Sequence, residues 1–293
     1  MRRFLGLVLL VLVGCESEPP PPRTVVVYAP SQLAENVDSF LTTRGFDVVM
    51  VGGESPELTS RVVDKTDSPR ADVIVVDSVA DAWRAGDRGA LRPLLAKSHE
   101  GVQQHLRDPD GSWVSIAFRP ALVMFQPGAA VPETLSYEDL GSSEYAGKLC
   151  LITSGQPLSR AVIGMLIDQL GEKPAERVVR RWVRNLAQPP FEDMSELGQA
   201  FGSGDCEVAR VSTGAWVPSA RIVVPSPLFF NVHAAGVSRH AEYPDVAQDA
   251  VAELAKLDTS VDRELKGSVA VNAAVAGWRD EEARLLAERA GYR

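Results

Sequence analysis

The chain has 293 residues, with 30 Lys and Arg against 39 Asp and Glu and a formal net charge of −9. Its composition, 45% hydrophobic and 24% charged, is that of a globular protein with a sizeable core, which excludes a disordered chain and a multi-span membrane protein. The net charge argues against nucleic acid and anionic lipid surfaces as partners, and a length about twice that of a usual domain predicts two lobes.

The first fifteen residues have the parts of a secretory signal. Arg2 and Arg3 precede an apolar run, Phe4 to Val13, that is too short to span a bilayer. Leu12-Val13-Gly14-Cys15 resembles the bacterial lipobox, in which the cysteine is acylated and becomes the first mature residue. We therefore expect residues 1–14 to be a signal peptide and Cys15 to carry the palmitate that anchors the protein to the membrane.

An acidic, proline-rich tract follows the cysteine, Glu16-Ser17-Glu18 and then Pro19 to Pro22. Proline cannot continue a helix and favours an extended polyproline conformation. Residues 15–23 are therefore predicted to be a lipidated cysteine with an extended spacer, which holds a folded body outside the cytoplasmic membrane.

Two cysteines remain in that body, Cys150 and Cys206, and both lie in apolar runs that are typical of strands. In an oxidising compartment they can form a disulfide that closes a loop of about 56 residues. Two buried free thiols are the alternative, because unpaired cysteine is a common core residue. The sequence leaves both open.

The body begins with three strand-helix units. Thr24 to Tyr28 predicts a buried strand, and Ser31 is placed to cap the helix after it, which Gly45 closes. Further strands are expected at 47–51 and 71–76, with helices at about 56–65 and from residue 78 to about 86. Continuous apolar strands of this kind favour a parallel sheet covered by helices on both faces.

The middle of the chain differs, because two apolar runs, Trp113 to Phe118 and Ala121 to Phe125, are separated only by Arg119-Pro120. They predict crossing strands rather than another strand-helix unit. The alternation then resumes with a strand at 148–152, helices at 158–170, 175–186 and 194–201, and a strand at 207–211. Two α/β units joined by extended segments again indicate two lobes.

Four strand ends carry the candidate binding residues, because ligands of open parallel sheets bind beyond the carboxyl ends of the strands, near helix N-termini. With two ends from each lobe, the cleft between the lobes is the expected site. Ser78 and Ser154 have helix capping as their alternative role. Phe229 and Phe230 either line the cleft or pack in the core. The candidate ligand-binding residues are Tyr28, Ser31, Gln32, Asp77, Ser78, Ser154, Gly155, Ser212, Thr213 and Trp216.

No motif supports an enzyme, because the sequence lacks a phosphate-binding loop, a Gly-x-Gly-x-x-Gly turn, a Gly-x-Ser-x-Gly elbow and a His-Glu-x-x-His helix. His99, His105, His233 and His240 have no metal-ligand spacing, and His233 lies in an apolar run where a core histidine is expected. We expect no catalytic residues and no required cofactor.

The ordered features resemble a periplasmic solute-binding protein of an ABC importer, and more narrowly the ferric-iron-binding branch of that superfamily. No single motif is specific, but the order and spacing cover most of the mature chain. The segments that carry the resemblance are Val25 to Tyr28, Arg70 to Val73 before Asp77, Trp113 to Arg119, Leu140, Gly147 to Leu149, Thr153 to Gly155, Gly204 to Trp216, Ala234 to Val237 and a helix at 247–254.

The resemblance implies a two-lobed α/β fold of the type II periplasmic-binding-protein class, with a mainly parallel sheet in each lobe, flanking helices and a ligand cleft between the lobes. On this basis residues 24–117 and about 230–265 form the first lobe. Residues 118–229 and about 266–293 form the second.

In that branch a pair of tyrosines before a tryptophan, a histidine in the first strand-helix loop and an acid in the second hold Fe³⁺. Here Gly214 and Ala215 precede Trp216, Gln32 or Ser31 occupies the histidine position, and Asp77 alone is retained. The expected ligand is therefore a ferric chelate that brings its own oxygens, or an organic or anionic small molecule, with Asp77 as a weak metal ligand.

The resemblance further implies a monomeric protein of the periplasmic cell envelope, lipid-anchored, whose partners are a small-molecule ligand, an ABC permease and its ATPase. The alternatives are a sensory or interaction module, or a lipid carrier, on the same fold.

Overall fold

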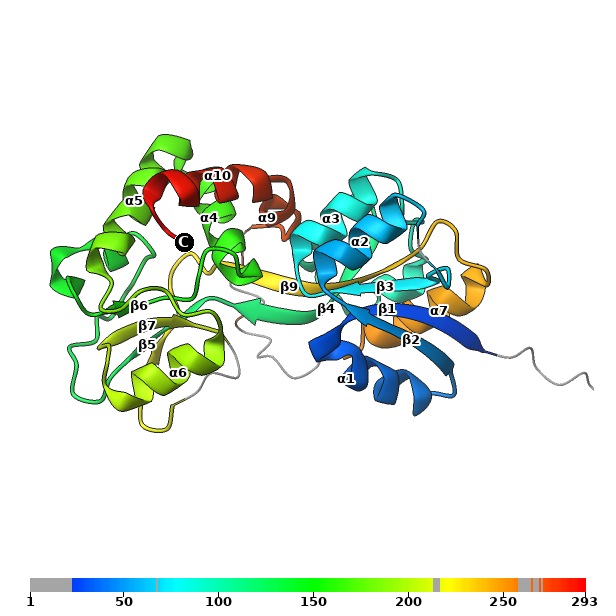
Figure 1. Cartoon of the computed structure of the whole chain (residues 1–293), viewed down its shortest axis with the longest axis horizontal. Helices are drawn as coiled ribbons and strands as arrows, with labels where there is room; N and C mark the ends of the chain where they lie inside the picture. The colour runs from blue at the N-terminus through cyan, green and yellow to red at the C-terminus, as the bar shows by residue number, and fades with distance from the viewer. Residues whose placement is uncertain (1–22, 67, 213–216, 258–264, 266–268, 270) are drawn as a thin grey trace, which may run out of the picture.

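The computed structural model describes residues 23–66, 68–212, 217–257, 265, 269 and 271–293. The predicted signal peptide, Cys15 and all but the last residue of the spacer lie outside this part of the chain. Two α/β lobes lie side by side along the longest axis of the molecule (Figure 1). The predicted two-lobed α/β architecture is therefore confirmed.

The first lobe is built on a five-stranded sheet in the order β2-β1-β3-β9-β4. Strand β1 (Thr24–Pro30) pairs in parallel with β2 (Asp47–Gly53) and with β3 (Val73–Val76). Strand β9 (Phe230–Val237) lies antiparallel between β3 and β4 (Trp113–Pro120). The sheet is thus half parallel and half antiparallel.

Helices cover both faces of this sheet, which explains why its strands are apolar on both sides. On one face Val25 and Val27 pack with helices α1 (Ser31–Thr42) and α7 (Pro244–Leu254). On the other face Tyr28 packs with helices α2 (Ser55–Val63) and α3 (Val79–Asp87). Figure 1 shows the two helix layers below and above the sheet.

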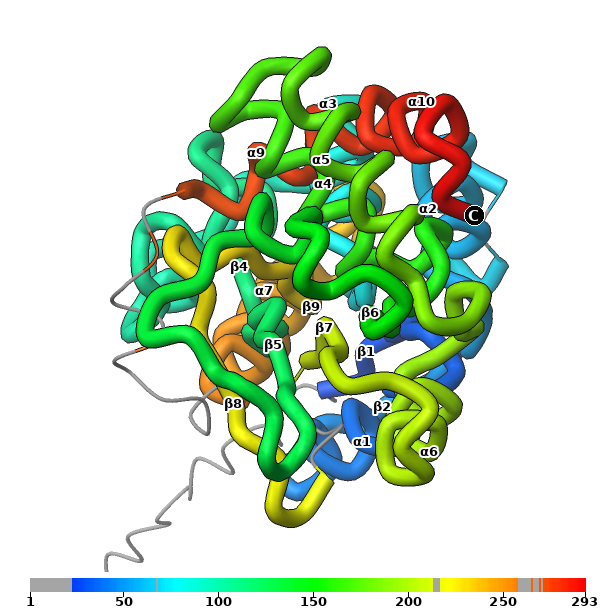
Figure 2. The backbone as a smooth tube through the Cα atoms, turned by 90° about the vertical axis from the view of Figure 1, so that its left-hand side faces the viewer, coloured from blue at the N-terminus to red at the C-terminus, as the bar shows by residue number. Residues whose placement is uncertain are grey.

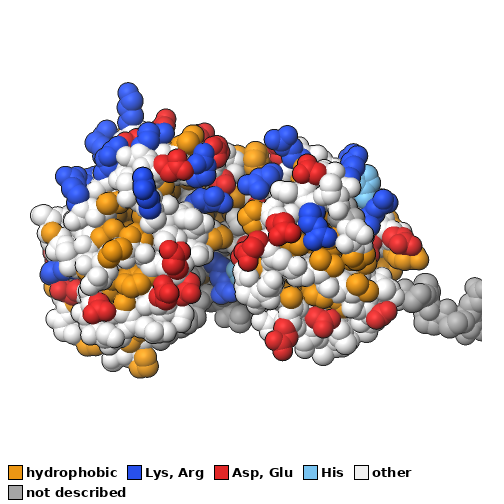
Figure 3. Space-filling model, in the orientation of Figure 1, with side chains coloured by type: hydrophobic (Ala, Val, Ile, Leu, Met, Phe, Trp, Pro, Cys, Tyr) orange, Lys and Arg blue, Asp and Glu red, His pale blue; other side chains and the backbone are white. Residues whose placement is uncertain are grey.

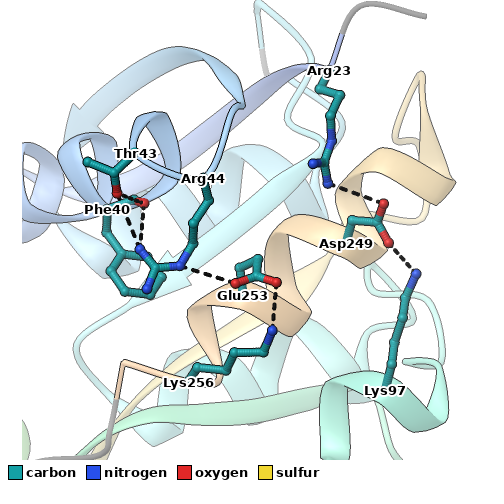
Figure 4. Close-up of polar contacts among 8 residues, drawn as sticks. All are labelled: Arg23, Phe40, Thr43, Arg44, Lys97, Asp249, Glu253 and Lys256. Carbon is teal, nitrogen blue, oxygen red and sulfur yellow. Dashed lines mark hydrogen bonds and ion pairs between the residues drawn. The ribbon is translucent and has the colours of Figure 1, made fainter. Parts of the chain in front are cut away.

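Ion pairs at the surface connect α7 to its neighbours in the first lobe (Figure 4). Asp249 pairs with Arg23 at the start of β1, at 3.3 Å, and with Lys97. Glu253 accepts a 3.1 Å hydrogen bond from Nε of Arg44, just after α1. Exposed pairs of this kind contribute about 0–1 kcal/mol each, so packing rather than charge holds α7 in place.

The second lobe has a four-stranded sheet in the order β6-β7-β5-β8. Strands β6 (Leu149–Cys150) and β7 (Val208–Val211) are parallel, whereas β5 (Leu122–Phe125) is antiparallel to both β7 and β8 (Arg221–Val223). Neither sheet is mainly parallel, so that detail of the prediction was wrong. In each sheet one strand next to an interlobe crossing, β9 in the first lobe and β5 in the second, runs antiparallel to the strands of the strand-helix units.

Helices also flank the second sheet. Helices α4 (Pro157–Leu170), α5 (Glu172–Asn185) and α10 (Asp280–Ala290) lie on one side, and α6 (Met194–Ser203) lies on the other (Figures 1 and 2). Short 3-10 helices occur in the connections, at Ala96–His99 (η1), Gln104–Leu106 (η2), Asp139–Gly141 (η3) and Ser143–Tyr145 (η4).

Cys150 and Cys206 form a disulfide in the second lobe. Both side chains are buried, at 0% and 3% exposed. The sequence left a disulfide and free thiols open, and the structure has the disulfide.

The chain crosses between the lobes at the ends of β4 and β9. Just beyond these strands the N–H of Ala121 donates to the carbonyl of Phe229 at 2.8 Å. The hydroxyl of Tyr137 donates to the carbonyl of Ala121 at 2.7 Å and accepts from the N–H of Phe229 at 3.0 Å. Phe229 and Phe230 are fully buried, so core packing is their role.

Helix α9 (Ala274–Trp278) lies between α3 of the first lobe and α4 of the second. A Cβ atom at Gly277 would come within 2.5 Å of the Cβ of Trp83, and one at Gly164 would lie 3.5 Å from the Cα of Ala276. The close approach of three backbones therefore depends on these small residues. The residue boundaries of the two lobes stay a prediction.

One helix start differs from its prediction. Helix α1 begins at Ser31 itself, after Pro30, and no side chain caps it. Among the helices in the described part of the chain, none has the length and apolar character needed to cross a membrane.

Candidate functional site

The carboxyl ends of β1 and β3 meet through the side chains of Gln32 and Asp77. Gln32 is the second residue of α1, and Asp77 directly follows β3. Because β1 and β3 are neighbouring parallel strands, their carboxyl ends lie at the same edge, and Nε2 of Gln32 donates to Oδ2 of Asp77 at 2.6 Å. The sequence placed both residues in the site, and the structure brings them together.

The loop that carries Asp77 is held by two polar side chains outside it. Asn231 of β9 donates from Nδ2 to the carbonyl of Asp77 at 2.7 Å and accepts the N–H of Val79 at Oδ1, at 3.1 Å. Ser55 accepts the N–H of Asp77 at 3.0 Å. Sequence reasoning missed both residues, although an asparagine directly after two buried phenylalanines was a signal.

Ser78 caps a helix, which was the alternative to a ligand contact. Its Oγ accepts the N–H of Ala80 at 3.2 Å at the start of α3, and the residue is 4% exposed. Ser31 is exposed at the start of α1, on the same loop as Gln32. Of the predicted site residues in the first lobe, Ser31, Gln32 and Asp77 are accessible at this edge.

Tyr28 points away from the accessible edge. Its side chain is 0% exposed, its hydroxyl donates to the carbonyl of Pro69 at 2.8 Å, and Nη2 of Arg61 donates to it at 2.8 Å. Residues 28 and 29 of a strand face opposite sides of the sheet, and residue 28 faces α2. The expectation that Tyr28 contacts the ligand is therefore not met in this structure.

A second acid, Asp81, lies one turn beyond Asp77 and is 1% exposed. Burial raises the pKa of Asp81 to about 6, the nearby Arg84 opposes the shift, and the charges of Asp280 and Asp77 reinforce it. Arg84 is 3.0 Å from Oδ1 of Asp81, and Asp280 in turn pairs with Arg160 of α4 at 2.9 Å. This charge network joins α3, α10 and α4 close to the candidate site.

The second lobe presents the loop 153–156 at the start of α4. Ser154 is half-buried and Gly155 is exposed, while Gln156 rather than Ser154 occupies the position before the helix. Gln156 donates from Nε2 to the carbonyl of Glu192 at 2.6 Å. The first residue of α4, Pro157, has no N–H, and no side chain caps the helix, so the N–H groups of the next two residues and the positive end of the dipole have no side-chain partner.

Ser212 follows β7 and is 9% exposed, and its hydroxyl has no hydrogen-bond partner in the described part of the chain. Thr213, Gly214, Ala215 and Trp216 lie outside the described residues, so the predicted contacts of Thr213 and Trp216 stay predictions. Parallel pairing of β6 with β7 places Ser212 beside the loop that contains Ser154.

Arg210, two residues before Ser212, was missed by sequence reasoning. It is 0% exposed, and its Nη2 donates to Oγ of Ser159 at 2.7 Å and to the hydroxyl of Tyr292 at 3.1 Å. Residues at 210 and 212 of a strand share a face, so this guanidinium lies on the α4 side of the sheet, behind the loop 153–156. Among the described residues no acidic side chain pairs with Arg210, so its buried charge adds to the positive potential there.

His233 is the core histidine that the sequence indicates. Its Nε2 accepts a 3.1 Å hydrogen bond from Nε of Arg119, and burial together with the Arg119 charge lowers its pKa to about 3. Among the residues that the structure describes, no three His, Cys, Asp or Glu side chains are grouped closely enough to hold a metal ion. Asp77 is thus a single acidic oxygen donor with a neutral amide beside it.

The molecule is hollowed between its lobes in the space-filling view (Figure 3). A separate recess of about 420 Å³ in the first lobe is lined by residues from Pro93 to Gly111 together with Asn272. It contains none of the predicted site residues.

Several curated relatives, including the following two, are similar to part of the chain, and no family model matches it. "Iron uptake protein A1" of Synechocystis sp. strain PCC 6803 is 27% identical over 176 residues, which are 59% of this chain and 49% of that protein. "Fe(3+)-binding periplasmic protein" of Serratia marcescens is 26% identical over 141 residues, 47% of this chain and 41% of that protein. The chain thus spans about half the length, or less, of the curated relatives it matches.

Solved structures match over nearly the whole chain. Trichodesmium FutA, solved with iron and citrate ligands, superimposes with a TM-score of 0.79 at 20% identity and covers 92% of this chain and 100% of that one. Iron-bound HitA from Pseudomonas aeruginosa gives a TM-score of 0.77 at 18% identity, with 92% and 100% covered. These matches show the fold, and the relatives' names confirm the resemblance to ferric-iron-binding proteins.

Proposed function

We propose that this chain is the solute-binding component of an ABC-type importer and that it binds a ferric chelate in the cleft between its lobes. The relatives are named for iron uptake and ferric-ion binding, and none of these names is that of an enzyme. They support a protein that binds and releases its ligand unchanged, with an ABC permease and ATPase as partners.

The observation that carries the choice of a chelate is the pairing of Gln32 with Asp77. The pair uses Nε2 and Oδ2, so Oε1 of Gln32 and Oδ1 of Asp77 are left for a ligand. Hard cations such as Ca²⁺ and Mg²⁺ take about six or more oxygen ligands, so one carboxylate oxygen and one neutral amide oxygen cannot by themselves hold a trivalent ion tightly. Gly214 and Ala215 add no side-chain donor. An iron complex that carries its own oxygen ligands needs few donors from the protein and therefore fits this site.

The second lobe supports an anionic chelate. The uncapped start of α4, the exposed backbone at Gly155 and the buried Arg210 behind them favour negative charge. Ferric complexes of hydroxycarboxylates such as citrate are anionic and present carboxylates to such donors. We therefore assign the acidic and amide oxygens of the first lobe to the metal side of the ligand and the α4 end to its carboxylate side.

The predicted lipoprotein signal and Cys15 support a site of action in the periplasm, tethered to the membrane. Radiolabelled palmitate should label the wild type and leave Cys15→Ala unlabelled. Equal labelling of the two would contradict the anchor while leaving the binding proposal intact.

Equilibrium dialysis followed by elemental analysis and native mass spectrometry tests the ligand. The protein is incubated with ferric citrate, with citrate alone, and with Fe³⁺ delivered from a weak chelator. We expect one iron to be retained together with citrate. Iron retained without any organic molecule would contradict the chelate, and retention of neither would favour a sensory, interaction or lipid-carrying role on the same fold.

A further inference from the structure

Helix α5 carries four exposed arginines on one face. Arg177, Arg180, Arg181 and Arg184 are spaced three and four residues apart, so they form a single stripe. The opposite face, with Val178, Val179 and Trp182, is buried against the second lobe. These four arginines, called the α5 stripe below, line a shallow surface recess by themselves.

The charges of the α5 stripe are largely uncompensated within the protein. Arg180 pairs with Glu176 at 2.7 Å, and that carboxylate is shared with Arg289. Within the described residues Arg177, Arg181 and Arg184 form no ion pair. Like charges at this spacing destabilise a helix, and only Arg184, in the last turn, is favoured by the helix dipole.

On helix α10, by contrast, both arginines form ion pairs with glutamates. Arg284 meets Glu281 at 2.6 Å and Glu288 at 2.5 Å, and Arg289 meets Glu172 at 2.6 Å and Glu176 at 3.1 Å. Within the described residues the arginines of α10 are therefore neutralised, whereas three of the four arginines of the α5 stripe have no acidic partner. Solvation alone does not explain that difference in a protein whose net charge is −9.

Although the net charge of the whole chain opposes an anionic surface, we propose that the local positive charge of the α5 stripe binds the phosphate groups of an anionic phospholipid surface. The guanidinium group matches phosphate with two parallel hydrogen bonds, and a row of arginines recognises a charged plane without needing a shaped pocket. The large exposed hydrophobic side chains in the described residues all lie outside α5. Protein-protein hot spots combine arginine with buried aromatic anchors, so a lipid surface fits the stripe better than an acidic protein does.

The placement of α5 suits this partner. Figure 3 shows Lys and Arg side chains gathered at the end of the molecule where Figure 1 places α5, and β1 begins at the other end of the long axis. The inference rests on the proposed function in one respect, the lipid anchor that precedes β1. A protein held at the membrane needs only weak further attraction, and contact at both ends lays its long axis along the surface.

Vesicle flotation of the full-length protein tests the proposal. The vesicles contain either phosphatidylcholine alone or phosphatidylcholine with phosphatidylglycerol, in about 0.1 M salt, where charges act over about 10 Å. The double variant Arg177→Gln/Arg184→Gln is compared with Arg284→Gln/Arg289→Gln, which removes the same charge from α10. Any binding through the N-terminal segment is common to all forms and cancels in the comparison.

We expect the α5 variant to lose about tenfold to thirtyfold in partitioning onto the anionic vesicles. The α10 variant should stay within about twofold of wild type, because the stripe keeps its charge. Arg177→Lys/Arg184→Lys should fall between the α5 and α10 variants, because lysine keeps the charge but loses the two parallel hydrogen bonds. Equal losses in the α5 and α10 variants would overturn the proposal in favour of net charge. Wild-type protein that does not prefer anionic vesicles would also overturn it and would leave an acidic protein as the partner. Unchanged ferric citrate binding in every variant separates this outcome from failure of the proposed function.

Discussion

The side-chain amide of Gln32 donates a 2.6 Å hydrogen bond to the carboxylate of Asp77, which lies 45 residues further along the chain. Since the carboxyl ends of β1 and β3 adjoin, two loops that are distant in sequence supply one amide and one acid at the same point. This pair defines the first-lobe side of the candidate site.

Asp77→Ala should weaken ferric citrate binding by about tenfold to a hundredfold, because a charged contact to the ligand is lost. Gln32→Ala should weaken it by about twofold to tenfold, as expected for a neutral group. Titration calorimetry measures both. Asp64→Asn, which changes an exposed acid after α2, is the control and should leave the affinity unchanged. Binding that is insensitive to Asp77 would place the ligand elsewhere.

Asn231 should be a positioning residue for Asp77. Asn231→Ala removes both hydrogen bonds to the loop 77–79 and is expected to cost about 1–3 kcal/mol of stability and to lower ligand affinity severalfold. Asn185→Ala is the matched control, because Asn185 likewise makes two hydrogen bonds to backbone atoms, donating to the carbonyls of Leu140 and Ser142, but in the second lobe. Asn185→Ala is expected to lower the unfolding free energy by a similar amount and to leave the ligand affinity unchanged. Equal affinity losses would indicate a general effect of destabilisation.

Asp81 should make stability fall as the pH rises through about 6. Its folded-state pKa of about 6 exceeds the ordinary value of 3.8, so the native state binds the extra proton between these values and its stabilising effect is lost above them. Asp81→Asn should flatten this part of the pH profile and raise the unfolding free energy at pH 7 by at most about 3 kcal/mol. Denaturant unfolding between pH 4 and 8 measures it, and an unchanged slope would contradict the assignment to Asp81.

Gly277→Ala should loosen the contact between α9 and α3. The added methyl group meets the Cβ of Trp83 within 2.5 Å, on the stiff part of that side chain, so the helices must separate; overpacking of this kind costs about 1–3 kcal/mol. Gly198→Ala in α6, with nothing within 4 Å, is the control and should stabilise by about 0.5–1 kcal/mol. Thermal unfolding would show opposite shifts in melting temperature. Shifts of the same sign would contradict the packing argument.

The Cys150–Cys206 disulfide should contribute about 4 kcal/mol by closing a 56-residue loop. Cys150→Ala/Cys206→Ala should lower the unfolding free energy by that order, and added reductant should not destabilise this variant further. A wild-type protein whose unfolding is the same with and without reductant, after full reduction of the unfolded state, would show that the bridge contributes little.

Local patterns in the sequence were sufficient for the strand-helix units of the first lobe. The apolar runs at 24–28, 47–51 and 71–76 are strands, and the predicted helices after them lie within a few residues of α1, α2 and α3. Such patterns do not show, however, which strands pair with each other or in which direction. Strand β9 enters the first sheet from far along the chain and runs antiparallel, so hydrophobicity alone could not reveal that half of the sheet is antiparallel.

The sequence predicts which residues lie at the ends of strands, and this was sufficient to find some candidate site residues. It does not predict which face of the sheet a side chain lies on, and the other residues depend on that. Gln32 and Asp77 follow from the meeting of two strand ends. Tyr28 was misplaced because it stands on the face of β1 that packs against α2, where Arg61 and Pro69 use its hydroxyl. Arg210 gave no signal as a single basic residue in an apolar run, since its partners Ser159 and Tyr292 come from distant segments.

The position of β9 also bears on the order in which the protein folds. Asn231 and Val79, which hydrogen-bond across the edge of the first lobe, are 152 residues apart in the sequence. Closing so long a loop is slow, and contacts of high sequence separation limit folding rates. The first lobe cannot complete its sheet until residues 230–237 are present, although most of its strands are made early. A chain exported as proposed above therefore cannot complete its first lobe until about four-fifths of its 293 residues have crossed the membrane.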